Sequence, residues 1–202
     1  MKRSIGVIFA VGAASSVAMA APVTLDFEGQ GYGDGSAIGN YGGLTFAAEA
    51  LAFTESLYQS FYNNTTAFPS GDIAMFNASG VGSVAATSGS DFDAISAMAS
   101  WWGTNDTQQS GSSTSITIEG WDDGVMVGTS TISLAQAFAN ISLGFTSIDE
   151  LRFINDGTAG HFWLLDDLTL DFDPQTIPLP TASSLAGLGL LGLGVRRRRK
   201  SL

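Results

Sequence analysis

Histidine, cysteine and acidic side chains most often carry catalysis or hold a metal ion, and this chain is unevenly supplied with them. It has no cysteine, one histidine and nineteen acidic residues. The lack of cysteine excludes disulfides, thiolate metal sites and cysteine nucleophiles. A Ser–His–Asp triad would have to use His161, and no G-x-S-x-G motif precedes it. The sequence therefore favours a non-catalytic protein, although paired carboxylates for glycoside hydrolysis stay open.

The charges of the chain are separated along the sequence. All nineteen acidic residues lie between Asp26 and Asp173, where Arg152 is the one basic residue, so this body has a formal charge of −18. The other seven basic residues stand within the first three and the last seven positions. Such a body repels nucleic acid phosphates and anionic lipids, which excludes both as its partners.

One acidic residue, Asp166, stands where an apolar residue is expected. With a period of two, the last strand places six residues on one face: Phe162, Leu164, Asp166, Leu168, Leu170 and Phe172. Five of the six are apolar, so Asp166 is expected to point toward the core, where a carboxylate needs a partner or a proton. Three partners are open: Arg152, backbone amides at a sheet edge or bulge, or a calcium ion shared with Asp26 or Glu28.

The elements that would position Asp166 are strands. Residues 23–172 show short apolar stretches separated by clusters of Gly, Ser, Asn and Asp, which is typical of a β-sandwich or jelly roll. We expect strands near 23–27, 44–48, 72–76, 80–86, 94–102, 148–155 and 161–172, and a hairpin over 115–134 that turns at Asp122-Asp123-Gly124. Residues 28–43 are too rich in glycine for regular structure, and 134–138 are expected to form one helical turn. The fold class predicted is all-β, a single β-sandwich over residues 21–174.

The first 20 residues have the three parts of a secretory signal peptide. Two basic residues are followed by an apolar stretch and by the small-x-small site Ala18-Met19-Ala20. Cleavage after Ala20 would start the mature chain at Ala21, outside the cytoplasm.

The last segment, residues 175–202, combines a proline motif, an apolar run and a basic end. Pro178 and Pro180 prevent a helix from starting before about Thr181. The fifteen residues from there to Val195 would span about 22 Å, less than the roughly 30 Å of a hydrocarbon core. The basic block, Arg196, Arg197, Arg198, Arg199 and Lys200, would stay cytoplasmic and hold the body on the far side of the inner membrane. We expect a transient anchor, a short transmembrane helix with an arginine-rich end.

This tail resembles the PEP-CTERM sorting signal of Gram-negative bacteria. The residues Ile177, Pro178, Leu179 and Pro180 of "IPLPTA" are similar to its VPLPA variant, with Ile177 in place of Val and Thr181 in place of Ala. The resemblance implies that a membrane-embedded exosortase is a partner, that the chain is cleaved near the motif, and that the product reaches the cell surface or extracellular matrix.

The body resembles galactose-binding-like jelly rolls through its terminal motifs, "DFEG" from Asp26 to Gly29 and "LLDDLTL" from Leu164 to Leu170. The resemblance implies that the first and last strands meet and that an acidic cluster there binds structural Ca²⁺, with Asp26 or Glu28 from the first motif and Asp166 or Asp167 from the second. Oxygen ligands suit calcium.

Three functions are compatible with these features. The first is an exported, exosortase-sorted, non-catalytic surface or matrix protein that binds extracellular polysaccharide. The second is a secreted glycan-active hydrolase, and the third is a structural matrix or surface protein without a small ligand. For the first, the aromatic residues that could stack on sugar rings are Tyr32, Tyr41, Trp101, Trp102, Trp121 and Trp163.

Both expected processing sites are tested by mass spectrometry of the mature protein from its host. We expect an N-terminus at Ala21 and a C-terminus near Pro178, because these are the cleavage positions that the two terminal motifs imply. A mature chain that still carries Met1 or Leu202 would contradict export or sorting.

Overall fold

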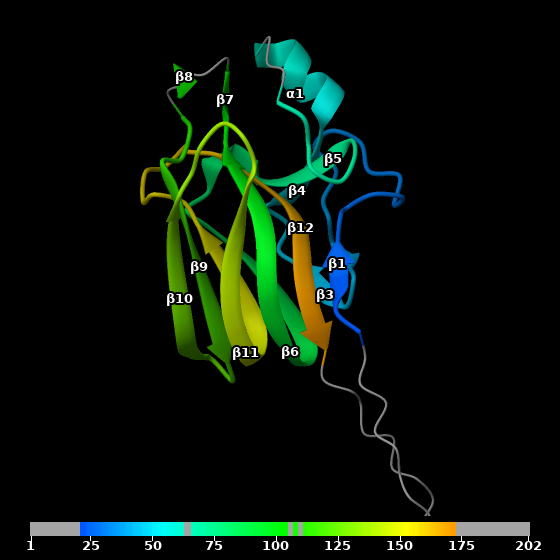
Figure 1. Cartoon of the computed structure of the whole chain (residues 1–202), viewed down its shortest axis with the longest axis vertical. Helices are drawn as coiled ribbons and strands as arrows, with labels where there is room; N and C mark the ends of the chain where they lie inside the picture. Colours follow the sequence, from blue (N-terminus) through cyan, green and yellow to red (C-terminus); the bar gives the residue numbers. More distant parts are fainter. Residues whose placement is uncertain (1–20, 63–65, 105–106, 109–110, 173–202) are drawn as a thin grey trace, which may run out of the picture.

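The computed structural model describes residues 21–62, 66–104, 107–108 and 111–172, so the expected signal peptide and sorting tail lie outside the described residues. Within these ranges, no helix has the length and apolar character needed to cross a membrane. Strands dominate the described chain (Figure 1). They are β1 (Val23–Leu25), β2 (Asn40–Tyr41), β3 (Leu44–Phe46), β4 (Ala50–Thr54), β5 (Ile73–Asn77), β6 (Ser83–Trp101), β7 (Gly103–Thr104), β8 (Thr107–Gln108), β9 (Ser115–Asp122), β10 (Val125–Ser133), β11 (Ala139–Ile154) and β12 (Trp163–Phe172). The helices are α1 (Glu55–Tyr62) and the 3₁₀ turn η1 (Ala78–Gly80).

Two long antiparallel strands, β6 and β11, join the two halves of the sandwich. The first part of β6 pairs with β3 and with the second part of β11, which also pairs with β9 and through it with β10. The second part of β6 pairs with the first part of β11 and with β12, which pairs with β1 and β5. Strand β4 completes this half beside β5. Ten strands therefore form one continuous antiparallel sheet, and the predicted all-β class is confirmed.

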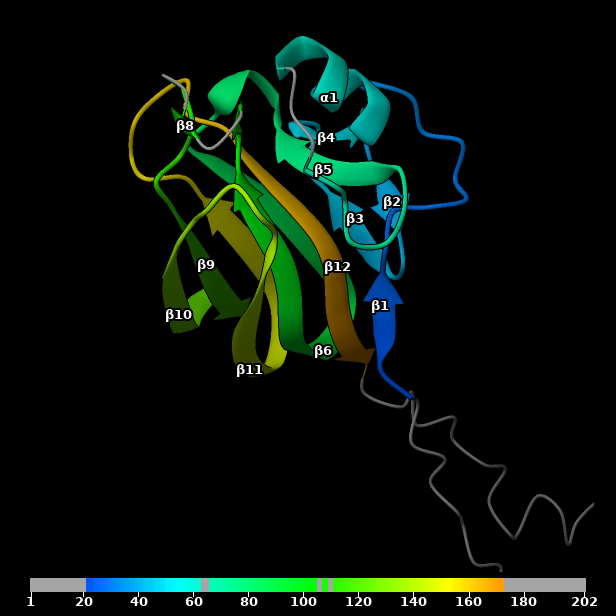
Figure 2. The ribbon, with the colours of Figure 1, turned by 45° about the horizontal axis from the view of Figure 1, so that its top comes forward.

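One apolar core lies between these two halves. The ring centroids of Phe153 on β11 and Trp163 on β12 are 5.9 Å apart, and those of Phe27 after β1 and Phe46 on β3 are 6.1 Å apart. Residues of β1, β3, β5, β6, β9, β11 and β12 all belong to the same buried cluster. Figure 2 shows the strands of the two halves wrapping around this space. The observed packing is that of a β-sandwich.

The sequence pattern divided the long strands too finely. The strands expected at 80–86 and 94–102 form one strand, β6, because Ser88-Gly89-Ser90 between them stays in extended backbone. The strand expected at 148–155 is the second part of β11, whose pairing with β6 shifts register three times between Ser142 and Glu150. Such irregularities bend a strand without ending it, so polar and glycine residues there do not mark a loop.

The hairpin of β9 and β10 is confirmed at the expected turn. Strand β9 ends at Asp122 and β10 begins at Val125. Asp123 and Gly124 have φ of 47° and 77°, the left-handed pair that a two-residue hairpin turn of type I′ requires.

The face of Asp166 differs from the prediction because β12 contains a bulge. Asp167 has φ of 48°, and the pairing of β12 with β6 shifts between Asp166 and Thr169. Before the bulge, Trp163 and Leu165 face the main core, whereas Leu164 belongs to a second cluster on the opposite face. After it, Leu168 and Leu170 face the main core. The six residues predicted on one face are therefore split between two.

Two further local predictions are wrong, and several elements were missed: helix α1, strands β4, β7 and β8, and the first part of β11. Residues 134–138 form a loop, and β2 lies within the stretch expected to have no regular structure. Helix α1 has no counterpart among the predicted elements. Its sequence signal is Thr54, whose hydroxyl accepts a hydrogen bond from the Leu57 amide at 3.3 Å, as an N-cap does. Tyr58 of α1 is fully buried in the second cluster, with Phe53, Phe68, Phe76 and Trp102.

Candidate functional site

The segments that carry the predicted acidic residues meet where two strands share one edge of β12, but the carboxylates of Asp26, Glu28, Asp166 and Asp167 do not all lie within 4.8 Å of one another. Strand β5 pairs with β12 only at Leu164 and Leu165, and β1 pairs with it from Leu168 to Leu170. Asp166 and the bulged Asp167 lie in the gap between them. Residues 26–28, after β1, and residues 70–72, before β5, close this gap. We call Asp26, Glu28, Ser70, Asp166 and Asp167 the carboxylate seam.

Asp166 is fully buried, as predicted, and its neighbours are hydrogen-bond donors. The Ser70 hydroxyl oxygen lies 2.9 Å from each oxygen of the Asp166 carboxyl, and the Ser70 amide donates to Oδ2 at 3.3 Å. The Asp167 amide donates to Oδ1 at 2.8 Å. The Ser70 hydroxyl also lies 3.3 Å from the carbonyl oxygen of Asp26. Ser70 thus joins the two terminal motifs of the body.

Of the three partners considered for Asp166, the structure shows backbone amides, together with the Ser70 hydroxyl. Arg152 lies elsewhere: its Nε donates to Glu150 at 2.6 Å, and its guanidinium carbon is 3.7 Å from the ring centroid of Trp121. Burial raises the pKa of Asp166 to about 7, although hydrogen bonds from Asp167 and Ser70 lower it, and the Asp167 charge raises it further. Donors alone therefore leave the buried charge only partly compensated.

Asp26 and Glu28 hold the two loops of the seam in place. Glu28 Oε1 accepts hydrogen bonds from the amides of Asp72 at 2.8 Å and Ile73 at 2.6 Å. A Cβ atom at Gly71 would lie 2.9 Å from the Glu28 carboxyl carbon, so only glycine allows this approach. Asp26 Oδ1 accepts from the Tyr41 hydroxyl at 2.8 Å. Burial, followed by the hydrogen bond and charge of Asp26, raises the pKa of Tyr41 to about 12.

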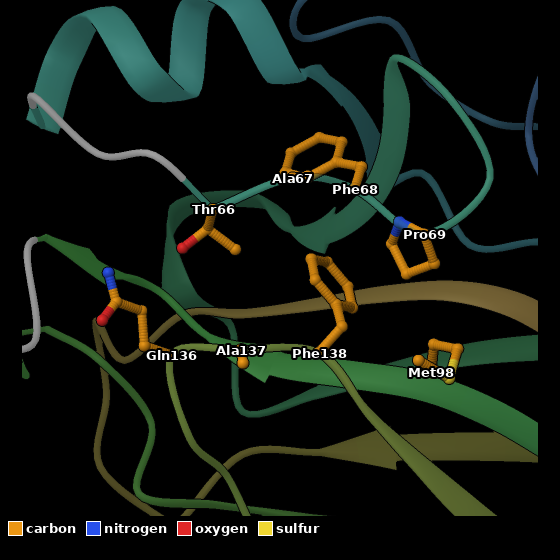
Figure 3. A pocket seen from close by; sticks show the side chains of 8 residues that line it. All are labelled: Thr66, Ala67, Phe68, Pro69, Met98, Gln136, Ala137 and Phe138. Atoms are coloured by element: carbon orange, nitrogen blue, oxygen red, sulfur yellow. The ribbon is translucent and has the colours of Figure 1, made fainter.

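An uncharged groove adjoins the seam. It has a volume of about 470 Å³, and its walls are the loop before Ser70 and the loop between β10 and β11. Met98, which pairs with Asp166 across β6 and β12, also lines it. Its eight lining residues include no charged side chain: Thr66, Ala67, Phe68, Pro69, Met98, Gln136, Ala137 and Phe138. In Figure 3, Thr66 and Gln136 lie toward one end and Pro69 and Met98 toward the other, with the rings of Phe68 and Phe138 between. These two rings meet edge to face, with centroids 5.6 Å apart.

This groove was not predicted from the sequence. Phe68 and Phe138 are seventy residues apart, and neither lies in a strand pattern that would place it beside the other. The turn residues Ser70, Gly71 and Asp72 signal a loop, but nothing in them indicates that the Ser70 side chain reaches Asp166.

The aromatic residues proposed as sugar platforms are mostly engaged in packing. Trp163 and Trp102 are buried, and Trp101 packs against the main core on the side opposite to Trp102. Tyr32 donates its hydroxyl to the Ile38 carbonyl. Trp121 is half-buried, with the Arg152 guanidinium over its ring and its Nε1 donating to Glu119 at 2.9 Å.

His161 takes part in the hydrogen bonds that fix the loop before β12. Its Nδ1 lies 2.9 Å from both carboxyl oxygens of Asp156. Burial acts to raise the pKa of Asp156, but hydrogen bonds from the Thr114 and Thr158 amides and from His161 outweigh it and hold that pKa well below its usual range. Asp156 also ties the loop before β12 to residue 114, because its Oδ2 accepts a hydrogen bond from the Thr114 amide at 2.8 Å.

A separate acidic group lies at the tip of the β9–β10 hairpin. The carboxylates of Asp122, Asp123 and Asp149 have oxygens within 4.8 Å of one another. The Asp123 amide donates to Asp149 at 3.3 Å. Burial, then the neighbouring charges of Asp123, Asp91 and Asp149, raise the pKa of Asp122. This group does not line the groove.

A comparison with solved structures finds two that are similar to this chain. The chain is similar to the C-terminal family 22 carbohydrate-binding module of xylanase 10B from Clostridium thermocellum, with 11% identity, a TM-score of 0.42 and coverage of 77% of this chain and 96% of that one. It is also similar to a structure of the N-terminal family 22 module and catalytic module of that enzyme with xylohexaose, with 14% identity, a TM-score of 0.40 and coverage of 79% of this chain and 30% of that one. No protein-family model matches the sequence, and no curated protein matches it significantly. The likeness to the PEP-CTERM signal therefore rests on the tail residues themselves.

The burial of Asp166 predicts an inverse dependence of stability on pH. Its pKa is raised in the folded protein, so the fold favours the protonated form; this stabilisation is complete below about pH 4 and is lost as the pH rises through about 7. In Asp166→Asn the side chain is neutral at every pH. Relative to this variant, we expect the wild type to lose on the order of 3–4 kcal/mol of unfolding free energy between pH 4 and pH 8. Urea denaturation in EGTA, followed by tryptophan fluorescence, measures the difference. A difference that stays constant with pH would show that Asp166 is ionised throughout.

Proposed function

We propose that this chain is an exported, non-catalytic surface or matrix protein that binds a neutral polysaccharide in the groove beside the carboxylate seam. The observation that carries this proposal is the contrast in charge: the groove has no charged side chain, although the body around it has a formal charge of −18. An anionic polysaccharide would be repelled at long range, whereas a neutral one would not.

The shape and chemistry of the groove support a sugar ligand. Its volume of about 470 Å³ falls within the range of small-ligand sites. A pyranose ring has an apolar face, and the groove offers the half-buried ring of Phe138, which packs on the buried ring of Phe68, with Thr66 and Gln136 toward one end. Both loops that form its walls are fixed at one end, the first by Ser70 at the seam and the second by β11.

The described residues give no comparable support to a hydrolase. His161 and Asp156, which contact each other, do not line the groove, and neither does the acidic group at the β9–β10 turn. A second hollow, of about 330 Å³, does contain acids, Glu28 and Asp72, but the Glu28 carboxylate is occupied by two backbone amides. A binding function therefore agrees better with the arrangement than glycoside hydrolysis.

We further propose that the seam holds a structural calcium ion. The Asp166 carboxylate, the Asp26 carbonyl and the Ser70 hydroxyl converge on one place, and Asp167 adjoins it. A buried carboxylate with a raised pKa is the group that a cation would compensate, and all these donors are oxygens, as calcium requires. Glu28 would act from the other side of the seam, by holding residues 72 and 73. Calcium would supply positive charge there and stabilise the loop that forms one wall of the groove.

Export and exosortase sorting belong to the same proposal and are supported by the two terminal motifs. A signal peptide and a temporary anchor would deliver the body to the outer surface, where polysaccharide is present. The termini found by mass spectrometry test this part independently of any binding.

The groove is tested by affinity electrophoresis on gels that contain neutral or uronate-rich polysaccharides. We expect a neutral polysaccharide to retard the wild type, and Phe138→Ala to weaken that binding about tenfold, because one stacked aromatic contributes roughly 1.4 kcal/mol. The control is Ile95→Ala, which truncates an exposed apolar residue on β6 outside the groove. Equal loss in both variants, or retardation by uronates alone, would contradict the site. Loss in Trp121→Ala, with Phe138→Ala unchanged, would move the site to the Trp121 face.

Calcium is tested by thermal unfolding at pH 8 with calcium or EGTA. We expect calcium to raise the melting temperature of the wild type by several degrees and to leave Asp166→Asn unchanged, since the variant lacks the buried anion. Asp149→Asn at the hairpin tip is the matched control and should respond as the wild type does. An equal response in Asp166→Asn would place any calcium site elsewhere.

A further inference from the structure

Most of the exposed large apolar side chains of the described residues gather at one place. There are five: Val23, Ile95, Val125, Met126 and Val127. The last three are consecutive at the start of β10, with exposed fractions of 64%, 47% and 53%. Three adjacent exposed apolar residues are costly to leave in water, and a patch of this kind marks an interaction surface when it is continuous with further bonding groups.

Those bonding groups are present, because β10 lies at the edge of the sheet. In the described part of the chain, β10 pairs with β9 alone, so the backbone amides and carbonyls on its other side have no strand partner. Edge strands usually carry a lysine, a proline or an inward-pointing charge that prevents pairing with another chain. Residues 125–133, "VMVGTSTIS", contain none of these. A bulge near Val127 is the one protective feature, and Gly128–Ser133 pairs regularly beyond it.

Charge indicates which partner this edge fits. A second copy would carry the same charge of −18, yet β10 has no charged residue of its own. The acids beside β10 are Asp122 and Asp123 at the turn and Glu119, which lies opposite Thr129 on β9. In an antiparallel pair about an axis at Val127, the two copies of Asp123 would be eight residues apart along the sheet, about 26 Å, beyond the Debye length of about 8 Å. A parallel pair would set the same acids side by side.

We propose that β10 pairs antiparallel with β10 of a second copy, about a two-fold axis near Val127, so that Val127 lies opposite its own copy and Val125 lies opposite Thr129. The proposal goes beyond polysaccharide binding and does not depend on it, since the groove is built from other residues. One pair of short strands buries less than the roughly 800 Å² per partner of a standard interface. The association is therefore weak in dilute solution and favoured where copies are concentrated on a surface.

The absence of cysteine from the chain allows a direct test by single-cysteine oxidation of the full-length protein in mild detergent. At a two-fold axis, directly opposite residues have Cα atoms about 4.5–5.5 Å apart, which a disulfide can bridge, so Val127→Cys should give at least about fivefold more disulfide dimer than Ser133→Cys. Ser133 is exposed on the same strand, but its counterpart would lie about 40 Å away. Equal dimer from the two cysteines would overturn the proposal.

A second test places a charge on the edge strand and measures the dimer fraction. Val127→Lys places a lysine on each side of the axis and should lower the dimer fraction in sedimentation at least about tenfold, while circular dichroism shows an unchanged fold. Val23→Lys, at an exposed valine of β1, is the matched control and should associate as the wild type does. If Val127→Lys still associates, the tail drives the association and the proposal is overturned. A wild type that stays monomeric at high concentration would overturn it as well. Retardation by polysaccharide should be unchanged in Val127→Lys, so failure of this inference and failure of the proposed function are distinguishable.

Discussion

The buried carboxyl of Asp166 is the constraint on which the arrangement of the loops depends. It lies at the one point of β12 where neither β5 nor β1 continues the sheet, so its oxygens replace the missing strand as acceptors for the Ser70 and Asp167 amides. When protonated, it can donate to the Ser70 hydroxyl, which in turn reaches the Asp26 carbonyl. When ionised, it accepts from the same hydroxyl. Two non-glycine residues with positive φ, Phe27 and Asp167, flank this contact, and such strain persists only where the surroundings fix it.

This contact also links the fold to the candidate binding site. Ser70 fixes the end of the loop that carries Phe68 and Pro69, and Met98, which lines the same end of the groove as Pro69, pairs with Asp166 itself. A change in the charge of Asp166 would therefore act on one wall of the groove through a single residue. The opposite wall is independent of the seam, because the loop before β11 is set by the bend and register of β6 and β11. The shape of the groove therefore depends on two things: the contact between Ser70 and Asp166 on one side, and the bend of β6 and β11 on the other.

How much the sequence predicts depends on how local the governing interaction is. The turn at Asp123-Gly124 follows from two residues that tolerate positive φ, and the burial of Asp166 follows from apolar neighbours within six residues. The meeting of β1 and β12, implied by the resemblance to jelly rolls, is confirmed. The residues of β12 that share a face were predicted wrongly, because one bulged residue reverses the alternation of side chains beyond it. The residue types near Asp167 give no sign of a bulge in the sequence. The groove and the role of Ser70 depend on pairs of residues 70 to 96 positions apart, which periodicity does not relate.

The distribution of charge limits where other molecules can bind to the body. With nineteen acids and one arginine, most of the body surface repels anionic polymers and other copies of itself. Arg152 does not relieve this, since Glu150 holds its guanidinium over Trp121. No charged side chain lines the groove between Phe68 and Phe138, and none belongs to β10. The groove and β10 lie on different parts of the sheet, the first over β6 beside β12 and the second beyond β9. As proposed, the groove would hold a neutral polymer and the edge of β10 would meet a neighbouring copy, and neither contact would block the other.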